Sequence, residues 1–107
     1  MNEITFLFSL SPTLKDRLRV SAKKERGSIL GFIVQYESWI RNKWHPIIRY
    51  DTAHGFPHKD VLHPDGRTDK QPIYFANYNL AFTHAIQDIK ILWQWYKESY
   101  KREMKND

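Results

Sequence analysis

The sequence predicts an α+β fold in which a small antiparallel β-sheet of about four strands packs one face against a long C-terminal α-helix. Apolar residues alternate with period two through most of the first 51 residues, whereas they recur at helical spacing toward the C-terminus. Strands followed by a helix are typical of this class. The chain has 107 residues and no repeat or linker, so we expect one domain over residues 1–107.

The first two strands are expected on either side of a Ser-Pro-Thr break. Residues 4–10 alternate in character, and RLRVSAK, residues 17–23, places its apolar side chains on one face and its cations on the other. A helix over residues 11–27 is the competing interpretation. The strand is favoured because KERG, residues 24–27, is typical of a turn that ends in a glycine.

Two further strands are expected before residue 52. The run SILGFIVQYESWI, residues 28–40, is rich in β-branched and aromatic residues. A turn at Asn42–Lys43 leads to WHPIIRYD, residues 44–51. Pro46 is expected near the start of that strand or on a sheet edge, because proline cannot donate a ladder hydrogen bond.

Between Thr52 and Pro72 the apolar residues recur at no regular spacing, and the sequence predicts a long irregular loop. The glycines and prolines that interrupt it are Gly55, Pro57, Pro64, Gly66 and Pro72. Ordered loops of this length inside a compact domain usually carry function. We therefore expect this loop to form the functional site of the protein.

The remaining residues predict one amphipathic helix, which Asn77 or Asn79 can cap. Its apolar stripe consists of Phe82, Ala85, Ile86, Ile89, Trp93, Tyr96 and Tyr100. Trp93 and Trp95 are two positions apart and cannot share one helix face. One of them is therefore expected to be exposed and available to a partner.

The amino-acid composition indicates which cellular compartment and which kinds of binding partner to expect. Lys and Arg number 17 against 12 Asp and Glu, and the net charge of +5 favours an anionic partner such as RNA, DNA or an acidic protein. The absence of cysteine excludes disulfides, thiolate metal ligands and a cysteine nucleophile, and it fits a reducing compartment. Residues 4–10 are too short to span a membrane and lack the features of a signal peptide. We expect a cytoplasmic protein that makes no membrane contact.

Histidines are concentrated in the loop and indicate acid–base chemistry. His58 and His63 are the expected acid–base pair, and His54 is the reserve candidate. Asp51 is expected to orient a histidine or the loop. Such a pair can cleave RNA by transesterification without a metal ion, so no cofactor is expected.

Cations and aromatic rings near the histidines are the candidates for RNA binding. The expected nucleic-acid-binding residues are Arg49, Lys59 and Arg67 beside the histidines, Tyr50 as a stacking ring, and Arg17, Arg19 and Lys23 on a basic strand face, and Phe56 could also stack on a base. Cations in register along a strand can hold phosphates. They fit equally well with protection of a sheet edge from pairing.

Two other interpretations of the loop stay open. Imidazoles and carboxylates together suit Zn²⁺ or another divalent ion, although no compact ligand motif is present. The polar residues can also be structural. Asp51 and Asp65 can cap turns, and HPDG, residues 63–66, is itself typical of a turn.

The layout RYDTAHG…H…H…DG…QPIYF…L…AIQDIK resembles the small prokaryotic proteins grouped as TumE-type toxins and their uncharacterised relatives. The matching positions are Arg49, Tyr50, Asp51, His58, His63, Gly66, Pro72, Tyr74, Phe75, Leu80 and Asp88. The likeness covers residues 47–91, less than half of the chain. It implies a toxin of a toxin–antitoxin pair that stops growth by acting on RNA, with a helix-turn-helix antitoxin as its partner.

The working hypothesis is therefore a growth-inhibiting ribonuclease toxin that needs no metal. The first alternative is a non-catalytic module that binds nucleic acid or a protein. The second is a metal-dependent hydrolase that uses Zn²⁺ or Mn²⁺. A homodimer in which the loop closes against a second chain is a further alternative.

Overall fold

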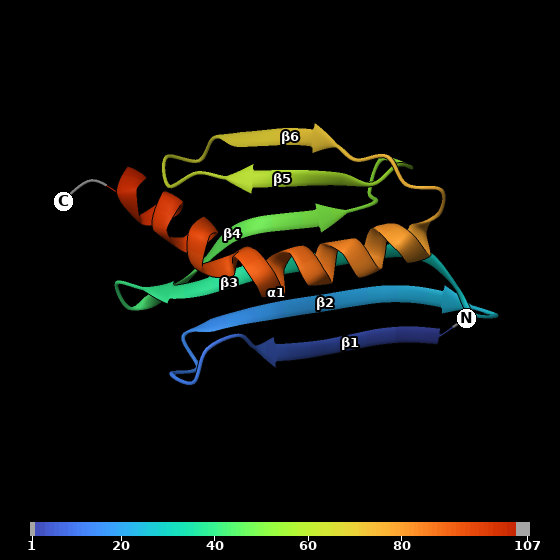
Figure 1. Cartoon of the computed structure of the whole chain (residues 1–107), viewed down its shortest axis with the longest axis horizontal. Coiled ribbons are helices and arrows are strands. Elements are labelled where there is room, and N and C mark those ends of the chain that lie inside the picture. The colour runs from blue at the N-terminus through green and yellow to red at the C-terminus, as the bar shows by residue number, and fades with distance from the viewer. Residues whose placement is uncertain (1, 105–107) are drawn as a thin grey trace.

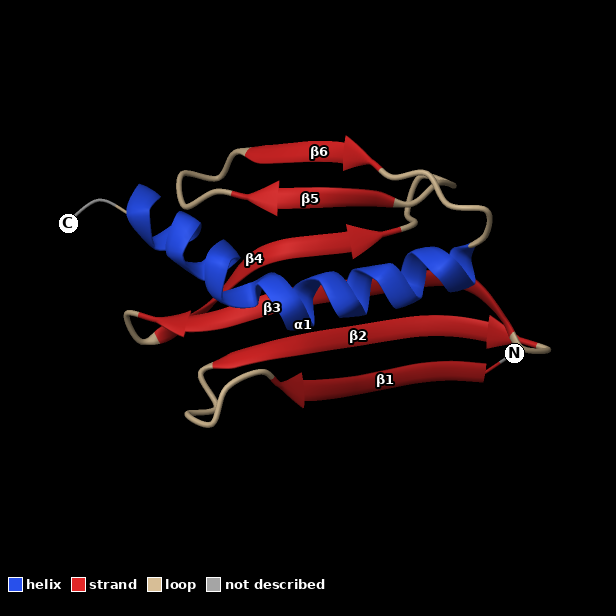
Figure 2. Ribbon diagram, in the orientation of Figure 1, coloured by secondary structure: helices blue, strands red, loops and turns tan. Residues whose placement is uncertain are grey.

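In the computed structural model, which describes residues 2–104, six strands form one antiparallel sheet and one helix crosses a face of that sheet (Figures 1 and 2). The elements are β1 (Asn2–Ser9), β2 (Asp16–Glu25), β3 (Ser28–Ile40), β4 (Lys43–Asp51), β5 (His58–Leu62), β6 (Thr68–Pro72) and α1 (Tyr78–Glu103). The strands lie in the sheet in chain order. The predicted α+β class, with an antiparallel sheet and a long C-terminal helix, is confirmed, but the sheet has six strands rather than about four.

The two additional strands, β5 and β6, lie within the segment that was predicted to be an irregular loop. They pair with each other along their whole length, and β5 also pairs with β4. Every residue of β6 is exposed, so this edge strand carries no apolar alternation by which the sequence could reveal it. The prediction of one long loop was therefore wrong. The HPDG segment is a turn, as one interpretation held, because the Gly66 N–H donates to the His63 carbonyl at 3.0 Å.

Two tight turns fix the register of β2, β3 and β4. Their central residues have positive φ, 51° at Arg26 and 80° at Gly27 in one turn, and 52° at Arg41 and 65° at Asn42 in the other. Positive φ at both positions is the type I′ geometry, whose twist matches that of antiparallel strands. The first turn confirms β2 as a strand rather than a helix. The second lies one residue earlier than predicted.

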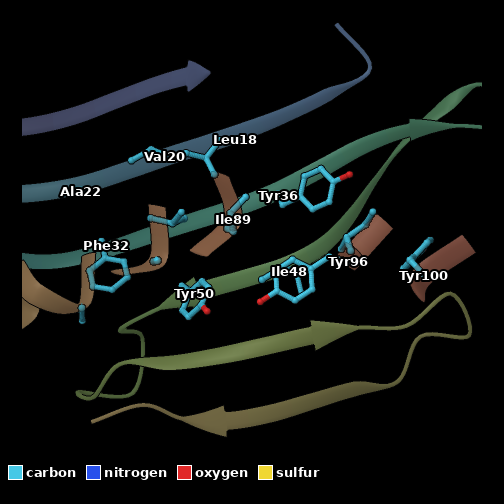
Figure 3. Packing of buried hydrophobic residues seen from close by; sticks show 14 residues of the cluster. Leu18, Val20, Ala22, Phe32, Tyr36, Ile48, Tyr50, Ile89, Tyr96 and Tyr100 are labelled. Atoms are coloured by element: carbon cyan, nitrogen blue, oxygen red, sulfur yellow. The ribbon is translucent and has the colours of Figure 1, made fainter. Parts of the chain in front are cut away.

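The face of the sheet that meets α1 forms the core, as Figure 3 shows. Its buried side chains come from β2, β3, β4 and α1. Trp93 packs partly buried against Tyr36, with ring centroids 6.2 Å apart, whereas Trp95 is 60% exposed. This difference confirms that only one of the two tryptophans faces the core. Asn77 is the N-cap, since its side chain accepts a hydrogen bond from the Leu80 N–H at 2.9 Å.

A buried carboxylate, Asp16, fastens α1 to the sheet at the start of β2. It accepts hydrogen bonds from the Tyr36 hydroxyl at 2.7 Å, the Ser38 hydroxyl at 2.7 Å and the Lys97 ammonium at 3.2 Å. Burial raises the pKa of Asp16, but the hydrogen bonds from Ser38, Tyr36 and Lys97 outweigh burial and hold the pKa below its ordinary value. The carboxylate therefore stays charged and links β2, β3 and α1.

The core packing predicts a large loss of stability for Ile89→Ala. Ile89 is fully buried, whereas Ile91 on the same helix is 74% exposed. Truncating a buried isoleucine leaves a cavity and should lower the free energy of unfolding by about 2–5 kcal/mol in urea denaturation. The matched change Ile91→Ala should alter it by less than about 0.5 kcal/mol. Equal losses in the two variants would contradict this packing.

Candidate functional site

The face of the sheet opposite α1, which we call the open face, carries a row of polar side chains that crosses the strands. Strand pairing aligns Arg19 on β2, Gln35 on β3, Arg49 on β4, Asp60 on β5 and Lys70 on β6. Aligned residues in neighbouring strands place their side chains side by side. The register therefore gathers residues that are far apart in sequence and puts cations on alternate strands.

Hydrogen bonds join one part of the open face into a network. Glu37, which is 7% exposed, accepts from Arg17 Nε at 2.7 Å and from Gln35 Nε2 at 2.6 Å, and it pairs with Arg19 Nε at 3.2 Å. Arg49 in turn donates its Nε to Gln35 Oε1 at 2.7 Å. Burial raises the pKa of Glu37, but the hydrogen bonds from Arg17, Gln35 and Arg19 outweigh burial and hold it below its ordinary value. These partners keep a charged carboxylate on the face of the sheet opposite α1.

Where β4 meets β5, Asp51, His58 and Asp60 form a buried cluster on the open face. Asp51 pairs with His58 across the strands, and Asp60 follows His58 by two residues and so faces the same side. His58 Nε2 lies 2.9 Å from Asp51 Oδ1 and 3.7 Å from Asp60 Oδ2. One ligand atom from each residue lies within 4.8 Å of the others, so this set could hold a metal ion. His58 itself is only 1% exposed.

The segment between β4 and β5 packs against this cluster. Asp51 Oδ1 accepts a hydrogen bond from the Ala53 N–H at 3.0 Å, which is the turn cap that the structural interpretation expected. The His54 ring stacks on the His58 ring with centroids 5.7 Å apart, and the Phe56 ring lies 5.8 Å from it. Three of the four predicted catalytic residues, Asp51, His54 and His58, are thus brought together.

An aromatic pocket of about 630 Å³ adjoins the cluster. Its lining residues are Phe56, Pro57, Lys70, Pro72, Ile73, Tyr74 and Phe75. Phe56 also packs on His58, and Lys70 Nζ lies 3.2 Å from Asp60 Oδ1. Because Phe56 and Lys70 line the pocket and also contact the cluster, the pocket lies beside the cluster.

His63, the fourth predicted catalytic residue, lies elsewhere. Its Nδ1 is 2.9 Å from Glu103 of α1, and its Nε2 is 2.8 Å from Asp69. His63 therefore points to the helix side of the sheet, whereas His58 points to the open face. The structure does not form the expected acid–base pair of His58 and His63, because His63, directly after the end of β5 and five residues beyond His58, points to the opposite side of the sheet.

Two predicted RNA-binding residues, Tyr50 and Lys59, also lie under α1. The Tyr50 hydroxyl donates to Asp88 at 2.8 Å, and Lys59 Nζ donates to the Tyr96 hydroxyl at 2.6 Å. Burial lowers the pKa of Lys59 and raises that of Tyr50 above its ordinary range. These bonds tie α1 to β4 and β5, so the two side chains serve the fold.

The remaining predicted RNA-binding residues divide between the open face and a turn. Those on the open face are Arg17, Arg19, Lys23 and Arg49. Arg67 lies at the β5–β6 turn, where its Nε is 2.7 Å from Asp65 Oδ2. Asp65 also accepts from the Arg67 N–H at 3.0 Å, so it caps this turn as the structural interpretation expected. Four cations therefore remain as candidates on one surface.

Lys70 and the pocket as a whole are site features that the sequence did not predict, whereas Asp60 was expected only as one of the loop carboxylates of the metal interpretation. A signal for Asp60 was present, because period two along residues 58–62 places it on the same face as His58. Lys70 and much of the pocket depend on β6, whose polar sequence gave no strand signal.

With this geometry established, the chain can be compared with known proteins. The model of the family described as Domain of unknown function (DUF7718) matches residues 1–106. The chain belongs to this family. No curated protein and no solved structure matches it. Within residues 2–104, no helix has the length and hydropathy needed to cross a bilayer.

The contacts of His63 predict a pH-dependent contribution to stability. Hydrogen bonds with Glu103 and then Asp69 raise the pKa of His63 above 6.5. A raised pKa stabilises the fold fully below the unfolded value, and this contribution is lost as the pH rises through the folded value. His63→Gln should therefore lower the free energy of unfolding more at about pH 5.5 than at about pH 8.5, by less than about 1 kcal/mol because both carboxylates are partly exposed. Urea denaturation at the two pH values measures the difference, and an effect that grows with pH would contradict the assignment.

Proposed function

We propose that the protein acts on RNA and binds it as a single strand along the open face. The observation that carries the proposal is the aromatic pocket beside a row of cations. Phe56, Tyr74 and Phe75 line the pocket together with Lys70, and Lys70 continues the row through Arg49 to Arg19. Aromatic rings that stack on bases, next to cations that hold phosphates, are the usual means of binding single-stranded nucleic acid.

The other end of the open face supports the same proposal. The Arg17 guanidinium lies 3.6 Å from the centroid of the Trp44 ring, and Trp44 packs edge-on against Trp39 with centroids 5.5 Å apart. Trp39 is 37% exposed. Rings and guanidinium planes of this kind offer further stacking surfaces for bases.

Cleavage of the bound strand is assigned to the groups that share this face. Asp51 and His58 lie beside the pocket, with His54 stacked on His58. His63 is not part of this assignment, because it lies on the helix side. The expected mechanism with two facing histidines is therefore set aside, and Asp51, His54 and His58 are the predicted catalytic residues that share the face with the pocket.

The resemblance to TumE-type toxins extends the proposal to growth inhibition in the cytoplasm, with a helix-turn-helix antitoxin as partner. Homodimerisation also stays a prediction. It is supported by β1, an edge strand that exposes Phe6, Leu7 and Phe8 by 42%, 56% and 42%. Long edge strands with exposed apolar residues are prone to pair with another chain.

Binding to single-stranded RNA should depend on the pocket. In fluorescence anisotropy with a labelled RNA oligonucleotide and a chelator present, Phe56→Ala should weaken binding about tenfold, since one base–ring stack contributes about 1–3 kcal/mol. Trp95→Ala, which removes an exposed ring from α1, should leave the affinity unchanged. Equal affinity of Phe56→Ala and the parent protein would exclude the pocket as the RNA site. Affinity that does not fall with added salt would argue against phosphate contacts.

Expression in bacteria tests the link between RNA and growth. The parent protein should slow growth, and the double change Arg19→Gln with Lys23→Gln should relieve the inhibition because it removes two cations from the open face. The charge-matched change Lys101→Gln with Arg102→Gln, on exposed helix residues, should remain inhibitory at equal protein levels. If cells grew equally with both double variants, toxicity would not depend on the cations of the open face.

A further inference from the structure

We propose that Asp51, His58 and Asp60 bind one divalent transition-metal ion, Zn²⁺ or Mn²⁺. The backbone fixes the three ligands, because Asp51 and His58 are a cross-strand pair and Asp60 lies two residues further along the same face. Their exposures are 7%, 1% and 5%, so the set is preformed and shielded from solvent. One imidazole and two carboxylates suit these borderline and harder ions.

The spacing of the ligand atoms fits an ion. Ligands bound at about 2.1 Å lie roughly 3.0–3.4 Å from their neighbours in a tetrahedral or octahedral shell. The distances from His58 Nε2 to Asp51 Oδ1 and to Asp60 Oδ2, 2.9 Å and 3.7 Å, lie on either side of this range. Moving Asp60 Oδ2 a few tenths of an ångström closer to His58 Nε2 would therefore bring both of these ligand pairs near the expected spacing.

The cluster also contains polar atoms that the protein leaves incompletely bonded. Among the described residues, His58 Nδ1 is buried without a hydrogen-bond partner, and Asp60 Oδ1 has only the ion pair with Lys70 at 3.2 Å. When Nε2 becomes a ligand the ring proton moves to Nδ1, for which the described residues provide no acceptor. A divalent ion would also neutralise the two buried carboxylates that lie beside His58 Nε2.

A second cluster, around His63, has a similar composition but a different arrangement of carboxylates around the ring. His63 also contacts two carboxylates, Asp69 and Glu103, but they bind opposite ring nitrogens, at 2.8 Å and 2.9 Å. Carboxylates on opposite sides of an imidazole cannot share one ion with it. In the Asp51–His58–Asp60 cluster both carboxylates face the same nitrogen. The His63 cluster therefore provides a matched control within the same chain.

The location of the site connects it to the proposed function. Lys70 pairs with Asp60 and also lines the aromatic pocket, so the cluster adjoins the proposed RNA-binding surface, and the three protein ligands leave further ligand positions on the ion. If RNA binds as proposed, a phosphate oxygen or a water molecule would occupy them. This last step depends on the proposed function, whereas the metal site itself does not.

Calorimetric titration of tag-free protein with ZnCl₂ and with MnCl₂, in the absence of RNA, tests the site. The parent protein should bind one ion per chain and show a higher Tm in its presence. Asp60→Asn should weaken binding about tenfold or more and abolish the Tm shift. The control Asp69→Asn should bind like the parent protein.

The outcomes separate the two proposals. Absence of saturable binding for both ions, undiminished binding by Asp60→Asn, or an equal loss in Asp69→Asn would overturn the metal site. Circular dichroism checks that each variant folds, and His58→Gln replaces Asp60→Asn if the latter does not. RNA binding measured with a chelator present tests the proposed function alone, so either proposal can fail while the other holds.

Discussion

One helix can cover only one face of a six-stranded sheet, and this constraint determines where the functional groups of the protein lie. The covered face takes the apolar residues of β2, β3 and β4, so the open face receives the alternate, mostly polar residues. Polar side chains that become buried there need partners, and those partners are found across the strands. Glu37 gathers Arg17, Arg19 and Gln35 in this way. Backbone register, rather than a flexible loop, therefore sets the geometry of the candidate site.

The polar bonds on the helix side serve a different purpose. Asp16 on β2 binds Lys97 of α1, and Asp88 of α1 accepts from the Tyr50 hydroxyl of β4. A core rich in tyrosine needs such acceptors, because buried hydroxyls must be hydrogen-bonded. These bonds hold α1 in place on the sheet. Stability therefore depends mainly on one face of the sheet, and the proposed binding on the other.

The sequence was sufficient for every element with a clear apolar period and insufficient where the period was absent. The strands from β1 to β4 and the helix follow from alternation and from the apolar stripe around Ile89. The β5–β6 hairpin was missed because its residues are polar on the open face and β6 has no buried face. The same omission misplaced His63. In a long loop it could have met His58, but the β5–β6 hairpin holds His63 directly after β5, with its ring on the side of the sheet opposite His58.

Two departures from ordinary packing coincide at one end of the open face. Asp16 shows how this chain satisfies a buried carboxylate, with three donors around it. Asp60 is equally buried but has an incompletely bonded oxygen, and the adjoining pocket leaves Tyr74 87% exposed. Neither feature belongs to the core, because Asp60 lies on the open face with only the Lys70 ion pair at its Oδ1, and Tyr74 is exposed. Natural proteins break local rules of this kind mainly at functional sites. The coincidence of both at the Asp51–His58–Asp60 cluster therefore favours this end of the sheet as the place where the protein meets its ligand.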